Sequence, residues 1–298
     1  MTSIELVNKF SDNEVVLPNT QKYAAILGLN PSSGARSPKL WNAAFERFSI
    51  DCEMIAIDVS ENNLDNLLKV LESDINFIGG AIAVPHKESA AEFCGENLTL
   101  EAKNIGSINC LYRNVDGFLF GTNTDGEGSL RAFESSFGAI SSQRILIMGA
   151  GGTGKAVAAY FVSSATNVKQ VSIVSRSDSA LRVAKRLNCE GLRWSSIDSI
   201  VSDFDIIINC TSLGSTLFPN LSPLSKSQLK TLRQTTIIYD VVYDPDPTKL
   251  LIYSSDYDLR VLNGKSMNFE QAVLGFYYAS SNLIDNLSVS NIRDAMVL

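Results

Sequence analysis

The sequence predicts an α/β protein of two domains, the second of which has a parallel, doubly wound sheet. Three observations support this prediction. The chain has 298 residues, more than one domain usually needs. Short apolar runs alternate with segments of helical period along most of its length. Near the middle, one apolar run leads directly into a glycine cluster, residues 149–154, as at a strand–helix turn.

The first half reads as alternating strands and helices that end in a hairpin. Asp116-Gly117 is a typical hairpin turn between two apolar runs. Ser37 is the expected N-cap of a helix, with Pro38 at its first position. Residues 1–20 carry no strong pattern and are interpreted as an added arm. The expected strands are 23–29, 54–59, 77–84, 107–112 and 118–121, and the expected helices are 39–47, 63–71 and 88–93.

The second half repeats the βα rhythm, which predicts a parallel sheet that binds ligands at the carboxyl ends of its strands. A helix over 125–133 links the halves, and the tail over 269–284 has an apolar, helical period. The expected strands are 145–148, 171–174, 205–209, 236–242 and 260–262, and the expected helices are 156–162 and 180–187.

Composition excludes several classes of function. The net charge of −7 argues against binding to nucleic acid or to an anionic membrane surface, because both need a basic face. No apolar run reaches 18 residues, and the N-terminus lacks the layout of a signal peptide. The five cysteines are scattered, which favours a reducing, cytoplasmic compartment. With one histidine, His86, and no paired cysteines, we expect no metal site.

The glycine cluster has the pattern Gly149-x-Gly151-x-x-Gly154 at the predicted strand–helix junction. Glycines allow the backbone to approach a pyrophosphate, and the free N–H groups of a helix start favour its negative charge. The cluster therefore predicts a Rossmann-type nucleotide site. A purely structural strand–turn–helix corner is the alternative.

The end of the next strand indicates which dinucleotide is bound. An acidic residue there suits the ribose hydroxyl of NAD, and a basic residue suits the phosphate of NADP. The strand ends in Ser175-Arg176-Ser177, and Asp178 comes only afterwards. Because a guanidinium is a planar fork of donors, NADP is favoured over NAD. The alternative is a solvated surface arginine.

Several short strings, taken together and in order, resemble the shikimate dehydrogenase family, including its quinate-type members. They extend over about residues 23–276. The resemblance implies a substrate domain over 1–126, with a C-terminal helix from 265–298 packed back on it, and a Rossmann NADP-binding domain over 127–264. The strings are Ser37-Pro38 with Asn42-Ala43-Ala44-Phe45, Val84-Pro85-His86-Lys87, Gly106-Ser107-Ile108-Asn109, Asn123-Thr124-Asp125-Gly126, the glycine cluster, Ser175-Arg176-Ser177, Asn209-Cys210-Thr211-Ser212-Leu213-Gly214, Tyr239-Asp240-Val241-Val242-Tyr243 with Pro245 and Thr248, Asn263-Gly264, Met267 and Gln271-Ala272.

The family's chemistry is reversible hydride transfer between NADP and a secondary alcohol on a carboxylated cyclohexene ring, a step of aromatic amino acid biosynthesis. The resemblance implies that Lys87 and Asp125 are the catalytic pair; otherwise they would read as a solvated lysine and an ordinary helix-start acid. It further implies monomers or homodimers. The implied substrate contacts are Ser37, Asn109, Tyr243 and Gln271, and the implied cofactor contacts are Gly149, Gly151, Gly152, Thr153, Gly154, Ser175, Arg176, Ser177, Thr211 and Gly264.

The chain departs from the family at three polar positions near the substrate. Alanines stand at 35, 81 and 83, where the family has a serine, an asparagine and a threonine. Ser32 or Ser33 could replace the missing hydroxyl at 35. Three lost hydrogen bonds would weaken recognition of shikimate, so an analogue with fewer or different hydroxyls is an open alternative. Two other readings stay open: an NAD-dependent quinate dehydrogenase, and a sensor that binds the cofactor without catalysis.

Overall fold

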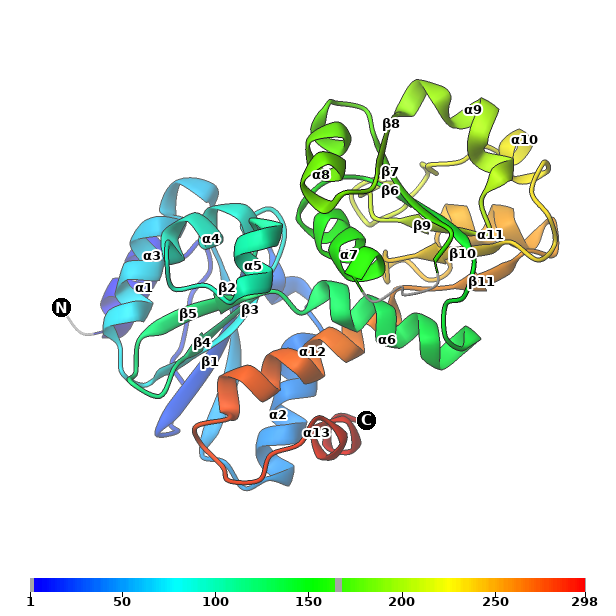
Figure 1. Cartoon of the computed structure of the whole chain (residues 1–298). Coiled ribbons are helices and arrows are strands. Elements are labelled where there is room, and N and C mark those ends of the chain that lie inside the picture. The colour runs from blue at the N-terminus through cyan, green and yellow to red at the C-terminus, as the bar shows by residue number, and fades with distance from the viewer. Residues whose placement is uncertain (1–2, 164–167, 298) are drawn as a thin grey trace. The chain divides into compact units, whose positions relative to one another are not determined.

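The computed structural model describes residues 3–163 and 168–297, and the chain divides into two compact units (Figure 1). The first unit comprises Met1–Thr124 with Gln271–Leu298, and the second comprises Asp125–Glu270. The boundaries expected from the sequence, 126/127 and 264/265, lie close to these divisions. The expected α/β class with a Rossmann-type second unit is confirmed by the two sheets described below.

The first unit is built on a five-stranded mixed sheet of order β2-β1-β3-β4-β5. β1 pairs in parallel with β2 and β3, and β3, β4 and β5 form an antiparallel meander. All five expected strands are present, and Gly117 adopts a positive φ of 84° in the predicted hairpin turn. The strands are β1 (Lys22–Gly28), β2 (Cys52–Asp58), β3 (Phe77–Ile82), β4 (Cys110–Arg113) and β5 (Leu119–Thr122). The helices are α1 (Ser3–Phe10), α2 (Ser37–Arg47), α3 (Glu61–Ser73), α4 (Lys87–Cys94), α5 (Leu100–Ile105), α12 (Lys265–Ser280) and α13 (Val289–Met296), of which α12 begins in the second unit.

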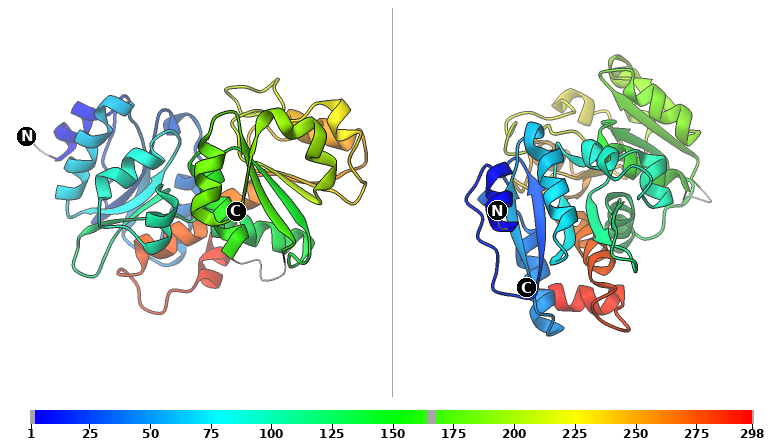
Figure 2. Two further views of the ribbon diagram at one scale, coloured as in Figure 1. Left: turned by 45° about the horizontal axis from the view of Figure 1, so that its top comes forward. Right: turned by 90° about the vertical axis from the view of Figure 1, so that its left-hand side faces the viewer.

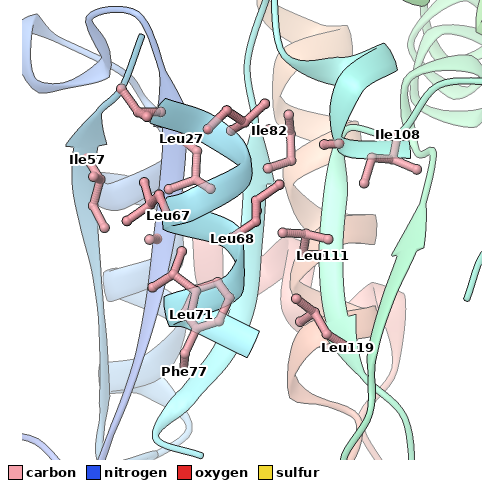
Figure 3. Packing of buried hydrophobic residues seen from close by; sticks show 14 of the residues in the cluster. Leu27, Ile57, Leu67, Leu68, Leu71, Phe77, Ile82, Ile108, Leu111 and Leu119 are labelled. Atoms are coloured by element: carbon pink, nitrogen blue, oxygen red, sulfur yellow. The ribbon is translucent and has the colours of Figure 1, made fainter. Parts of the chain in front are cut away.

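One face of this sheet is covered by α3, whose leucines recur at helical spacing. Leu67, Leu68 and Leu71 are fully buried. Figure 3 shows them beside Leu27, Ile57, Phe77 and Ile82 from β1, β2 and β3. Burying one such side chain stabilises the fold by about 1.5–3 kcal/mol, so this helix is a large part of the unit's core.

The opposite face is covered by α2 and by α12 from Gln271 onward. Trp41 and Phe45 from α2 pack on Phe276, with ring centroids 5.5 and 4.9 Å away. The indole N–H of Trp41 donates to the carbonyl of Ala272 at 3.1 Å. The C-terminal segment is therefore an integral part of the first unit.

The N-terminal segment is a structured element, which the sequence did not predict. Helix α1 packs on α3 through the fully buried Val7. After α1, the side-chain amide of Asn13 accepts from the N–H of Asp58 at 2.8 Å and donates to the carbonyl of Ala56 at 3.2 Å. Asn13 thus takes the place of a neighbouring peptide group along β2, the edge strand. The sequence signal of the N-terminal segment is weak because α1 is short and has a single buried residue, Val7.

The second unit has a six-stranded parallel sheet of order β11-β10-β9-β6-β7-β8. This is the strand order typical of dinucleotide-binding domains, with its topological switch between β6 and β9. The strands are β6 (Arg144–Met148), β7 (Gln170–Ser175), β8 (Glu190–Arg193), β9 (Ile206–Asn209), β10 (Ile237–Asp240) and β11 (Arg260–Leu262). The helices are α6 (Asp125–Phe137), α7 (Gly152–Ser163), α8 (Ser179–Leu187), α9 (Ile197–Ile200), α10 (Lys226–Leu229) and α11 (Lys249–Ser255).

Helices cover both faces of the second sheet (Figures 1 and 2). Alternate residues of β6 point to opposite sides: Ile145 and Ile147 pack in a cluster with α6, α7 and α8, while Leu146 and Met148 pack in a cluster with α9, α10 and α11. Burial on both faces explains why these strands read as continuous apolar runs. The edge strand β8 lacks such a run, and the sequence did not predict it.

Over residues 3–163 and 168–297, no helix combines the length and apolar character that crossing a bilayer would require.

Candidate functional site

The glycine turn follows β6 at the topological switch of the second sheet, and its glycines have separate roles. Gly149 has a φ of 105°, and a Cβ there would lie 2.9 Å from the carbonyl oxygen of Cys210. A Cβ on Gly154 would lie 2.1 Å from the carbonyl oxygen of Gly149. A Cβ on Gly151 would meet none of the described residues within 4 Å. The first and third glycines thus allow the tight turn and helix packing, while the second leaves open space where a pyrophosphate can approach.

Helix α7 begins at Gly152, so its free N–H groups lie at this open space. Among the described residues of its first turn there is no acidic side chain. The structure therefore fits a dinucleotide phosphate at the helix start. Thr153, in the same turn, donates its hydroxyl to Asp125 Oδ2 at 3.2 Å.

A second loop reaches the switch point from the end of β9. The N–H of Cys210 donates to the carbonyl of Met148 at 2.8 Å, which holds this loop against the glycine turn. Asn209 Oδ1 accepts from the N–H and the hydroxyl of Thr211, at 3.0 and 2.7 Å. Thr211 therefore lies beside the glycine turn, and its conformation is fixed by Asn209.

The Ser175-Arg176-Ser177 sequence forms the end of β7 and the loop after it. Arg176 and Ser177 are exposed, whereas Ser175 is buried. The Ser175 hydroxyl donates to the carbonyl of Ser177 at 2.6 Å and accepts from the N–H of Ala180 at 3.0 Å. Ser175 thus organises the start of α8. Arg176 presents an exposed guanidinium to a ribose phosphate, and the exposed Ser177 hydroxyl shares a hydrogen bond of 2.8 Å with the Ser179 hydroxyl.

Arg193 is a candidate site residue that the sequence did not indicate. It ends β8 and pairs in register with Ser175 on β7. Its guanidinium forms an ion pair with Asp178 at 2.9 Å, and both side chains are exposed. A second cation thus lies beside the position where the cofactor ribose would be recognised, and it offsets the charge of Asp178. Only the strand β8, which was not predicted, reveals this neighbourhood.

Tyr243 and Gly264 lie after β10 and β11. Tyr243 is half-buried in the loop between β10 and α11. A Cβ on Gly264 would lie 2.1 Å from the carbonyl oxygen of Val241, so only glycine allows these two loops to approach so closely.

In the first unit, Lys87 is the first residue of α4 and is half-buried. Its carbonyl accepts from the N–H of Ile108 at 2.9 Å, which fixes the start of the helix. The preceding His86 is buried, and its Nε2 lies 2.7 Å from the carbonyl oxygen of Val59. His86 Nδ1 is buried and has no hydrogen-bond partner among the described residues. The lysine thus projects from a backbone that is held on both sides.

Asn109 and Gln271 are brought together by the structure although 162 residues separate them. The Asn109 amide donates to Gln271 Oε1 at 3.2 Å and to the Thr124 hydroxyl at 3.0 Å. It accepts from the N–H of Thr124 at 2.8 Å. Thr124 belongs to this cluster and was not predicted as a site residue, although the string 123–126 contains it.

The topology explains why these side chains share an edge of the first sheet. Lys87 and Thr124 follow the carboxyl ends of β3 and β5, which run in the same direction. Asn109 precedes β4, which runs in the opposite direction, so it lies at the same edge. The loop after β1, residues 29–36, also begins there.

Ser37 is buried and begins α2, so the prediction that it caps the helix is wrong. Arg36 occupies the N-cap and makes no side-chain capping bond. The Ser32 hydroxyl donates to Asp58 Oδ2 at 2.5 Å, and the Ser33 hydroxyl donates to the carbonyl of Asn30 at 2.9 Å. Neither hydroxyl proton is left to replace the group that Ala35 lacks.

Asp125 is the first residue of α6 and is 4% exposed. A carboxylate in this first turn is favoured by the helix dipole. Its contact with Thr153 connects it to α7. The two helices pack closely because Gly126 has no side chain; a Cβ there would lie 2.3 Å from the carbonyl oxygen of Ala156.

Over the described ranges, no group of three or more histidine, cysteine or acidic side chains could hold a metal ion.

Comparisons with known proteins agree with this arrangement. Residues 27–111 match the family model of the shikimate dehydrogenase substrate binding domain, and residues 131–242 match that of shikimate / quinate 5-dehydrogenase. The shikimate dehydrogenase (NADP(+)) of Bacillus mycoides is 32% identical over 83% of this chain and 88% of its own. That of Pyrococcus furiosus is 33% identical over 86% of this chain and 89% of its own.

Solved structures show the same likeness. The shikimate 5-dehydrogenase of Thermus thermophilus in complex with NADP(H) and shikimate is 26% identical, with a TM-score of 0.76 over 92% of this chain and 98% of its own. The shikimate dehydrogenase of Aquifex aeolicus has a TM-score of 0.80 over 95% of this chain and 100% of its own; at 21% identity, that likeness concerns the fold.

Proposed function

The chain belongs to the shikimate dehydrogenase family, as its sequence strings indicated, and we propose from this premise that it is an NADP-dependent oxidoreductase. Its reaction interconverts a secondary alcohol and a ketone on a shikimate-like cyclic carboxylic acid. The observation that carries the proposal is the glycine turn at the switch point of the second sheet, open at Gly151 and followed by the start of α7.

The preference for NADP rests on the end of β7. Arg176 is exposed there, and Arg193 on the adjacent strand neutralises Asp178, the nearest acid in the loop. Two guanidinium groups favour a phosphate, whereas NAD recognition relies on an acid that accepts from the ribose hydroxyl. Bound NADP would supply the hydride acceptor for alcohol oxidation.

Lys87 is the proposed acid and base of the reaction. Oxidation of the alcohol requires an acceptor for its proton, and reduction of the ketone requires a donor at the forming alkoxide. A half-buried lysine at a fixed helix start can fill both roles. Asp125 is the second proposed catalytic residue, a carboxylate that holds the substrate hydroxyl in place, and Thr153 in turn holds Asp125.

The substrate contacts proposed are Ser37, Asn109, Gln271 and Tyr243. The Asn109 and Gln271 amides already bond each other, and an amide pair can exchange such bonds for those of a diol. A methyl group stands at each of positions 35, 81 and 83, which favours a ring with fewer or different polar substituents than shikimate as the better substrate.

The test is a panel of shikimate, quinate, aminoshikimate and simpler cyclic hydroxy acids, each with NADP and NAD, followed at the nicotinamide absorbance band. Reduction of NADP by at least one ring alcohol supports the proposal. Turnover with NAD and quinate alone would support the NAD-dependent alternative. Binding of NADP without any turnover would support the sensor.

A variant separates catalysis from binding. Lys87→Ala should lower kcat by roughly 10²–10⁴-fold, the usual contribution of an acid–base group, and leave the Kd for NADP unchanged. A rise in the Kd for NADP as large as the fall in kcat would contradict the role of Lys87.

The proposal includes a monomer or homodimer in a cytoplasmic setting, and sedimentation of the purified chain tests the oligomeric state.

A further inference from the structure

Asp240 is a buried carboxylate at the end of β10, between two loops of the second unit. It is 0% exposed. Its Oδ1 accepts from the Asn209 amide at 2.9 Å and from the N–H of Val242 at 3.1 Å. Its Oδ2 accepts from the Thr248 hydroxyl at 2.6 Å. One side chain therefore receives three hydrogen bonds from three residues in two loops.

The bond to Asn209 leads to the cofactor loop, residues 209–214. Asn209 uses its amide nitrogen on Asp240 and on the carbonyl of Leu213, and its oxygen on Thr211. The orientation of this amide thus decides where Thr211 lies. Without an acceptor at 240, the amide nitrogen would keep only the Leu213 carbonyl, an acceptor within the same loop, and would lose its bond to the end of β10.

The other two bonds lead to the substrate loop, residues 241–248. Val242 and Thr248 stand on either side of Tyr243, so Asp240 fixes the loop near both ends. Thr248 also caps α11 by accepting from the N–H of Leu251. The position of Tyr243 depends on this closure of the loop.

Stability alone does not explain a carboxylate here. The three donors are an amide, a backbone N–H and a hydroxyl, all uncharged. Burial raises the pKa of Asp240 to about 6, against the lowering effect of these hydrogen bonds. A buried charge without a counter-charge is energetically costly. The hydrogen bonds that Asp240 accepts from two loops therefore explain this carboxylate better than a gain in stability does.

We propose that Asp240 is a positioning residue that holds the cofactor loop 209–214 and the substrate loop 241–248 in fixed relation to one another. This inference rests on the proposed function, which assigns Thr211 to the cofactor and Tyr243 to the substrate. It predicts that one side chain controls the binding of both ligands without contacting either.

The test compares variants that release both loops with variants that release one. Asp240→Ala removes all the acceptors, and both the Kd for NADP and the KM for the ring substrate should rise about tenfold or more. Thr248→Val frees only the substrate loop, so KM should rise while the Kd for NADP stays. Asn209→Ala frees the cofactor loop, so the Kd for NADP should rise more than the KM for the ring substrate.

Two conservative variants serve as controls. In Asp240→Asn, the remaining oxygen can still accept from Asn209 and Val242, and the new amide can donate to the Thr248 hydroxyl. This variant should keep both constants within about threefold of the native values. Thr248→Ser retains the hydroxyl and should behave in the same way. All measurements are made well below the melting temperature of the least stable variant.

The inference is overturned if Asp240→Ala changes only one constant, or if Asp240→Asn is as damaging as Asp240→Ala. Direct NADP binding, by quenching of protein fluorescence, does not depend on turnover. If no ring alcohol is oxidised, the proposed function fails, while hydrogen exchange of residues 209–214 and 241–248 still reports the release of both loops. Unchanged protection of either loop in Asp240→Ala would then contradict the positioning role.

Discussion

The hydroxyl of Thr153 donates to Asp125 Oδ2 at 3.2 Å, and this bond connects the candidate catalytic carboxylate to the helix that follows the glycine turn. Both residues stand in the first turn of a helix, α6 for Asp125 and α7 for Thr153. In the proposed reaction this glycine-rich segment would therefore have two functions: its backbone is open to the phosphates, and its threonine orients Asp125, the proposed catalytic carboxylate.

This contact predicts that Thr153→Val lowers kcat several-fold, because valine keeps the shape of threonine and loses the donor. One hydrogen bond to a charged group contributes about 1.5–3 kcal/mol, which corresponds to a tenfold or larger loss if the whole bond acts in the transition state. Steady-state kinetics with saturating NADP measure this effect. Thr153→Ser keeps the hydroxyl and should retain kcat. A change confined to the Kd for NADP would show that Thr153 serves the cofactor alone.

The ion pair between Arg193 and Asp178 leads to a prediction about cofactor choice. Arg193→Ala removes one cation and exposes the charge of Asp178 to the ribose phosphate. The Kd for NADP should rise about threefold to tenfold, as for an exposed charged contact, and the Kd for NAD should stay. Arg176→Ala should have the larger effect, and the double variant should bind the two cofactors almost equally.

Lys230→Ala is the matched control, because Lys230 is exposed and lies at the end of α10. Helix α10 packs on the face of the second sheet opposite to the face that α8 covers. It removes the same charge and should leave both Kd values unchanged. Equal weakening by Lys230→Ala would mean that net charge, and not the end of β8, decides the affinity.

The sequence predicted the features whose signals are local. The glycine turn, the hairpin at Asp116-Gly117 and the apolar strands of both sheets depend on residues close together in the chain, and they are present as expected. The edge strand β8 was missed because its four residues, Glu-Gly-Leu-Arg, include a single branched apolar side chain. Helix α1 was missed for a similar reason, since its one fully buried residue is Val7.

The site was harder to predict wherever it depends on distant pairs. Thr124 joins Asn109 and Gln271 only because β4 and β5 form a hairpin and α12 returns to this sheet. Arg193 acquires its proposed role only from its register with Ser175. No spacing in the sequence encodes such neighbours, since they arise from the order of strands in a sheet.

The alanines at positions 35, 81 and 83, in the proposed substrate site, give a prediction about specificity. Ala83→Thr with Ala35→Ser should raise kcat/KM for shikimate about tenfold, because two hydroxyls return to positions that Ser32 and Ser33 cannot serve. Residue 83 packs against Gly28, where a Cβ would lie 2.9 Å from the Ala83 Cβ, so glycine at position 28 is kept in every variant. Ala83→Val with Ala35→Ser has the same bulk without the threonine hydroxyl. If both double variants improve shikimate turnover equally, shape and not hydrogen bonding limits the native enzyme.

The raised pKa of Asp240 predicts how the stability of the second unit depends on pH. Its pKa is about 6 in the folded chain and near 3.8 in the unfolded chain, so the folded state binds the proton more tightly. The stabilisation from protonated Asp240 is fully present below pH 3.8 and is lost as the pH rises through about 6. Asp240→Asn does not titrate, so the native protein should gain on the order of 2–3 kcal/mol relative to this variant between pH 7 and pH 4.

Urea unfolding at a series of pH values measures this difference. The chain has two tryptophans, Trp41 in the first unit and Trp194 in the second, so a Trp41→Phe background reports the second unit alone. Thr248→Val supplies a further check. The Thr248 hydroxyl lowers the pKa of Asp240, so its removal should move the midpoint of the pH dependence upward. If the native protein and the Asp240→Asn variant differ in unfolding free energy by the same amount at pH 4 and pH 7, this carboxyl does not carry a raised pKa.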